Sequence, residues 1–151
     1  MGVWDWLFGS EVSPPTEPPH PPPVHLARGR GFTFEIVGEG NYQDALDLVC
    51  GGKCEDGHKL STTAQLVFQE DNPHDPNAIA VLIDRRVVGY IPRDLAPGMR
   101  SDILRLNPEE RPVTCEAKVV GGWLRYGGDE GHYGVRLSLA EPLRVGPQER
   151  R

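Results

Sequence analysis

Apolar and polar side chains alternate regularly in two stretches of the C-terminal half of the chain. In residues 113–120 every second position is apolar, as at Cys115, and residues 133–139 repeat this pattern around Val135. Alternation with a period of two is typical of a β-strand that buries one face. The sequence therefore predicts two half-buried strands, joined by a Gly-rich connection over residues 121–131.

Further strands and two helices are expected upstream of this pair. Runs rich in β-branched and aromatic residues predict strands over 32–37, 62–69, 78–83 and 87–91. A first helix is expected to begin at an Asn41 cap and to stop at Gly51. A second helix is expected over residues 93–106, with an interruption at Pro97. Short strands with one or two helices predict a mostly β (α+β) fold, built as a small barrel of about six strands.

A polar loop separates two of the expected strands. It brings Asn72, His74, Asp75 and Asn77 close together and contains two prolines. Proline has a fixed φ and no backbone donor, and Asn and Asp side chains hydrogen-bond their own backbone. The residues therefore predict a rigid, polar loop at the lip of a sheet. A turn without any further role is the alternative interpretation.

Three short motifs occur in a fixed order around this loop. Gly-Glu-Gly-Asn-Tyr stands at 38–42, Asn-Pro-His-Asp-Pro-Asn-Ala-Ile at 72–79, and Val-Gly-Tyr-Ile-Pro at 88–92, before a helical stretch. This series resembles the HIRAN domain over about residues 32–143. The resemblance implies a small β-barrel related to the OB-fold. In the N-terminal modules of eukaryotic fork-remodelling translocases this domain holds the 3′ end of single-stranded DNA, and many short bacterial members lack a motor.

The resemblance also implies roles for single residues. Tyr42 would stack on a base, and Asp75 would accept a hydrogen bond from a free 3′-hydroxyl group while repelling a 3′-phosphate. Two departures from the translocase pattern are Asn41 before Tyr42, where those modules carry consecutive aromatics, and His74, where they have an aromatic. The DNA-binding candidates are Tyr42, Asn72, His74, Asp75, Asn77, Tyr90, Arg93 and Trp123. Turn capping by Asp75 and packing of Tyr42 under the helix are the structural alternatives.

The composition narrows the choice of function. A chain of 151 residues has room for one domain and a tail, and its net charge of −6 argues against non-specific binding of duplex DNA. The charge leaves open a module that holds a strand end by stacking and hydrogen bonds. We expect recognition of a free 3′ single-stranded end, in repair or replication-fork processing. The alternatives are a protein-interaction or adaptor module that uses the same cleft, and a metal-dependent hydrolase.

Composition along the chain suggests its organisation. An aromatic segment at 1–9 precedes a Pro-rich disordered linker at 10–30, a domain at 31–145 and a disordered tail at 146–151. The first 30 residues are a candidate contact for a protein partner. We expect a cytoplasmic protein, because the sequence has neither a signal peptide nor an apolar stretch long enough to span a bilayer.

The cysteines and the missing catalytic motifs complete the expectations. Three cysteines, an odd number, suit a reducing compartment better than a disulfide framework. Cys50, Cys54 and His58 are weak candidates for a zinc site, which needs four ligands. We find no phosphate-binding loop, nucleophile elbow or zinc-protease motif. We therefore expect no catalytic activity and no cofactor.

Overall fold

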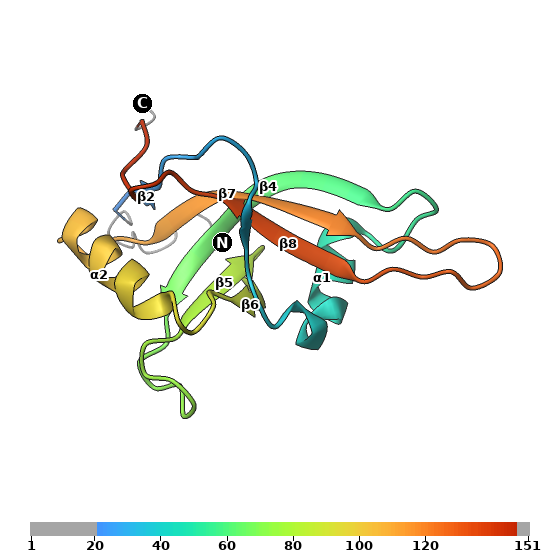
Figure 1. Ribbon diagram of the computed structural model, residues 1–151, viewed down its shortest axis with the longest axis horizontal. Helices are drawn as coiled ribbons and strands as arrows, with labels where there is room; N and C mark the ends of the chain where they lie inside the picture. Colours follow the sequence, from blue (N-terminus) through green and yellow to red (C-terminus); the bar gives the residue numbers. More distant parts are fainter. Residues whose placement is uncertain (1–20, 148–151) are drawn as a thin grey trace, which may run out of the picture.

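The structure is a computed structural model that describes residues 21–147. One curled, mainly antiparallel sheet forms a half-barrel, which is consistent with an OB-like fold (Figure 1). Its strands are β2 (Val24–His25), β3 (Phe34–Glu35), β4 (His58–Phe68), β5 (Ile79–Ile83), β6 (Arg86–Tyr90), β7 (Val113–Gly121) and β8 (Tyr133–Ser138). Six of them follow in the order β3-β8-β7-β4-β5-β6, and β2 pairs in parallel with the first residues of β7. The mostly β prediction is confirmed.

The two edges of the sheet meet at one point. Val37, just after β3, forms an antiparallel bridge with Tyr90 at the end of β6. Each residue donates its backbone N–H to the carbonyl of the other, at 2.8 Å in both directions. This bridge holds the segment that contains the first motif against the strand that contains the third.

The alternating pattern of the long strands builds the core. In β7 the apolar positions point inward, and Cys115, Ala117 and Val119 are fully buried. The other elements supply aliphatic side chains to the same cluster, including Leu46 from α1 (Gln43–Cys50) and Ile103 from α2 (Ala96–Leu106). Burying such side chains is the main stabilising contribution to a fold of this size.

The helix α1 begins later than expected. Asn41 does not cap it but ends a short 3-10 helix, η1 (Glu39–Asn41), and Tyr42 occupies the cap position without a side-chain hydrogen bond. Instead, the amide of Gln43 donates to the carbonyl of Tyr133 and accepts from its N–H, so that the helix is attached to the first residue of β8. The expected stop is confirmed, because Gly51 adopts the left-handed conformation at the C-cap.

Pro97 does not interrupt the second helix. It lies in the first turn of α2, where backbone N–H groups have no acceptor within the helix. The missing N–H of proline therefore costs no helical hydrogen bond there. The expected interruption at this position is therefore wrong, and so is the expected start of the helix at residue 93. Among residues 21–147, no helix is long and apolar enough to cross a membrane.

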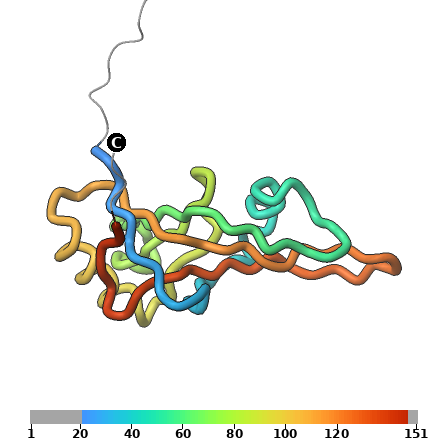
Figure 2. The backbone as a smooth tube through the Cα atoms, turned by 90° about the horizontal axis from the view of Figure 1, so that it is seen from above, coloured from blue at the N-terminus to red at the C-terminus, as the bar shows by residue number. Residues whose placement is uncertain are grey.

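The folded region begins before residue 31. Val24 and His25 pair with β7, and Leu26 is completely buried, although these residues fall within the stretch expected to be linker. The backbone N–H of Gly146 donates to the carbonyl of His25 at 2.8 Å, so the two ends of the described region lie together (Figure 2). The expected segment 1–9, most of the expected linker and most of the expected tail lie outside the described residues.

Candidate nucleic-acid interface

The loop between β4 and β5 is ordered by its own side chains. Oδ1 of Asn72 accepts hydrogen bonds from the backbone N–H groups of His74 at 2.8 Å and Asp75 at 3.2 Å. Oδ1 of Asp75 in turn accepts the N–H of Asn77 at 2.9 Å. Asn and Asp thus form consecutive turns, as the residue types predicted. These bonds fix the direction of the loop and keep the second carboxylate oxygen of Asp75 out of the turn.

Asp75 is the least exposed of the charged groups in this loop. Its side chain is 17% exposed, and its Oδ2 lies 4.0 Å from Nε of Arg93. The Arg93 side chain is 78% exposed and donates to the carbonyl of His74 at 3.0 Å. A largely covered carboxylate, beside a guanidinium that reaches into solvent, can accept one hydrogen bond while the cation attracts an anion.

Two tyrosines stand next to the loop. The rings of Tyr42 and Tyr90 lie 6.3 Å apart between centroids and are tilted by 49°. The hydroxyl of Tyr90 donates to Oε1 of Gln69 at 2.9 Å, and the amide of Asn72 donates to the same oxygen at 3.2 Å. Partial burial, together with the nearby Tyr90, raises the pKa of Tyr42. Each tyrosine remains partly exposed, so the pair can offer an aromatic surface, and Tyr90 is connected to the polar loop through Gln69.

A comparison with models of protein families shows which family the chain belongs to. The family model of the HIRAN domain matches residues 35–126. The chain belongs to the HIRAN domain family. HIRAN domains are generally DNA-binding modules, and the matched residues include both tyrosines and the whole polar loop. No curated protein and no solved structure matches the chain.

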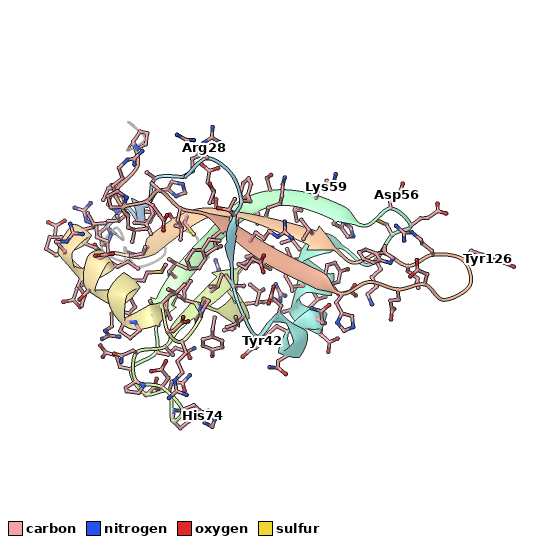
Figure 3. All side chains as sticks on the ribbon, in the orientation of Figure 1. Arg28, Tyr42, Asp56, Lys59, His74 and Tyr126 are labelled. Carbon is pink, nitrogen blue, oxygen red and sulfur yellow. The ribbon has the colours of Figure 1, made fainter. Side chains whose placement is uncertain are left out.

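The residues predicted for DNA binding fall into two groups in this HIRAN domain. Seven of the eight lie in the loop, at the start of α1 or at the end of β6 and just after it (Figure 3). Trp123 stands apart, on the hairpin that joins β7 to β8. There it is contacted by Arg125, whose guanidinium lies 5.1 Å from the ring centroid, and by Gly131, which leaves no room for a side chain.

Gln69 is a part of the site that the sequence did not single out. Its side chain joins Asn72 to Tyr90, and therefore joins the loop to the opposite strand. The residue stands at the first position of the polar run, directly after β4, and this position was the only available signal. Glutamine at a strand end is common, so residue type alone does not identify such a bridge.

The weak zinc candidates lie near one another but do not form a complete site. Sγ of Cys54 is 3.7 Å from Nε2 of His58, and the same nitrogen lies 2.8 Å from the carbonyl oxygen of Gly52. Partial burial raises the pKa of the Cys50 thiol, which opposes binding of a metal by its thiolate. In the part of the chain that the structure describes, no group of three His, Cys, Asp or Glu side chains could hold a metal ion.

Proposed function

We propose that this HIRAN domain binds single-stranded DNA at a free 3′ end, in DNA repair or replication-fork processing. The observation that supports this most is the position of Asp75. Its carboxylate is mostly covered and oriented by the turn, and it lies 4.0 Å from the exposed guanidinium of Arg93. Hydrogen bonds through Asn72 and Gln69 connect its loop to Tyr90, one of the two paired tyrosines. Each part corresponds to one chemical feature of a strand end.

The terminal hydroxyl group is matched by the carboxylate. Asp75 offers an oxygen that the turn does not use, so it can accept a hydrogen bond from a 3′-hydroxyl. A 3′-phosphate at the same place would bring negative charge to within about 4 Å of the carboxylate. Repulsion at that distance costs about 1 kcal/mol in water and about 4 kcal/mol near a protein surface. Discrimination of about fivefold or more between the two ends follows.

The rest of the strand end is matched by the neighbouring residues. Arg93 can neutralise the first phosphodiester group, since its guanidinium is exposed and anchored at His74. A base can stack on the tyrosine pair, which contributes about 1–3 kcal/mol for each base and does not depend on its identity. Binding of this kind needs few cations, and it is therefore compatible with a net charge of −6.

Fluorescence anisotropy with a short labelled oligonucleotide tests the proposal. We expect wild-type protein to bind the 3′-hydroxyl strand at least about fivefold more tightly than the 3′-phosphate strand. Asp75→Asn should abolish this preference. Asp94→Asn is the matched control, because Asp94 is exposed and carries the same charge. Equal binding of both strands by the wild-type protein would falsify end recognition.

A further inference from the structure

The outer face of the sheet carries a second feature that the proposed function does not use. On β4, β7 and β8 the side chains that point away from the core include Lys59, Lys118 and Arg136. We call these three residues the basic face. Lys59 and Arg136 are exposed and Lys118 is half-buried. The alternation of β-strands places all three on one side, because Lys118 is in register with Arg136, and Lys59 lies diagonally across from Lys118.

Two of these cations are directly opposite each other. Lys118 and Arg136 are cross-strand partners in the pairing of β7 with β8. Like charges at such positions destabilise a sheet, whereas opposite charges would stabilise it. Within residues 21–147, no carboxylate lies within ion-pair distance of Lys59, Lys118 or Arg136. The arrangement therefore leaves the three cations available to an external anion.

Neighbouring residues leave the charges of the basic face without an ion-pair partner. The ammonium of Lys118 lies 5.1 Å from the centroid of the Phe32 ring, and this attraction restricts the side chain. Glu116, the nearest acidic residue on β7, is 3.6 Å from Nη1 of Arg28 and is thereby occupied. Glu35 stands in register with Arg136 but makes no ion pair with it among the described residues.

The basic face and the polar loop lie on different sides of the molecule. In Figure 3, Arg28 and Lys59 project from the upper side of the sheet, whereas Tyr42 and His74 lie on its lower side. A strand end held at Asp75 and a ligand of Lys59 would therefore approach the sheet from different sides.

We propose that the basic face binds the phosphate backbone of duplex DNA. Duplex DNA has a higher density of negative charge than a single strand. A cluster of cations that binds it therefore releases more counterions, which increases the affinity. Phe32 is occupied by Lys118, so the face has no free aromatic platform of the kind that single strands use. The net charge of −6 describes the whole chain, whereas affinity for a backbone depends on the local cluster. This second contact needs DNA as the ligand, but it does not require recognition of a 3′ end.

The test uses the full chain and a short blunt duplex with a phosphate on both 3′ ends. The phosphates prevent the strand ends from binding at Asp75. Anisotropy is measured over a range of salt concentrations for wild type and for Lys118→Gln with Arg136→Gln. Loss of two phosphate contacts should reduce the slope of log K against log salt by about 1.8, and reduce affinity at low salt by about tenfold or more. The matched control is Arg85→Gln with Arg86→Gln, which removes the same charge from the exposed hairpin between β5 and β6.

The outcomes separate this proposal from the proposed function. The preference for a 3′-hydroxyl over a 3′-phosphate should be unchanged in the basic-face variant. An equal loss in the Arg85 and Arg86 control would overturn the proposal. So would tighter binding of the matching 3′-phosphate single strand than of the duplex, or no binding of the duplex by wild type. If end discrimination fails but the duplex result holds, only the proposed function is lost.

Discussion

The hydroxyl of Tyr90 donates a hydrogen bond of 2.9 Å to Oε1 of Gln69, and so joins the last strand of the half-barrel to the start of the polar loop. The same oxygen accepts the amide of Asn72. The backbone of Tyr90 also bridges to Val37, close to the first motif. Tyr90 therefore links all three motifs that define the family resemblance.

Replacing Tyr90 by phenylalanine should loosen the loop while preserving the barrel. The ring remains, but Gln69 loses one of its two donors, and the free energy of unfolding should fall by about 0.5–1.5 kcal/mol. Hydrogen exchange of the loop amides, above all those of His74 and Asp75, should become faster. Tyr126→Phe serves as the control, since that side chain is fully exposed. Unchanged exchange in the loop would contradict the role assigned to the Tyr90 hydroxyl.

The two asparagines of the loop should respond very differently to substitution. Asn72 makes three side-chain hydrogen bonds, two of them to backbone N–H groups, so Asn72→Ala should destabilise the protein by about 1–3 kcal/mol. Asn77 is exposed and its contact to Asp75 is made by its backbone, so Asn77→Ala should have an effect below about 0.5 kcal/mol. Urea denaturation measures both. A larger loss for Asn77 than for Asn72 would show that the turn is organised differently.

Stability should decrease at alkaline pH through Cys115. Burial in the core is the main cause that raises the pKa of this thiol to about 12, from an ordinary value of 9.0, and Glu116 adds to the effect. The contribution of the neutral thiol is complete below pH 9.0 and is lost as the pH rises toward about 12, because the unfolded chain ionises first. The stability difference between wild type and Cys115→Ala should therefore shrink across this interval. A constant difference, measured by urea unfolding, would contradict the assignment.

Gly131 should be essential for the position of Trp123. A Cβ atom built on Gly131 would lie 2.3 Å from the indole ring, so Gly131→Ala must displace that ring from Arg125. With Trp4 and Trp6 replaced by phenylalanine, tryptophan fluorescence would report on Trp123 alone, and we expect a shift toward the spectrum of a solvated indole. Gly40→Ala is the control, because nothing lies within 4 Å of a side chain there. An unchanged spectrum would mean that the indole has another place to pack.

The strands were the easiest part to predict from the sequence, for a physical reason. In β7 the alternation of Cys115, Ala117 and Val119 with polar residues reflects one buried and one exposed face, so local sequence and tertiary environment agree. The helix start was harder, because Asn41 is a favourable cap by type while the actual anchor is Gln43, which bonds to a strand residue 90 positions away. Such a partner leaves no mark in the local sequence.

The candidate site could be predicted only in part. The turn formed by Asn72, Asp75 and Asn77 follows from side chains that bond to neighbouring backbone, and the structure has these bonds. The bridge through Gln69 and the pairing of Lys118 with Arg136 depend on strand register, which short-range patterns do not fix. For the same reason the sequence could not show that Trp123 lies on a separate hairpin.

The parallel pairing of β2 with β7 determines the order in which the fold can be completed. His25 and Thr114, whose side chains meet at 2.8 Å, are 89 residues apart in the chain. The backbone of Ala27 donates to the carbonyl of Arg144 and accepts from the N–H of Ala140. The carbonyl of His25 accepts the N–H of Gly146. Contacts of such long sequence separation slow folding, because the long loop between the paired residues must close first, so the pairing of β2 is expected among the later steps of folding.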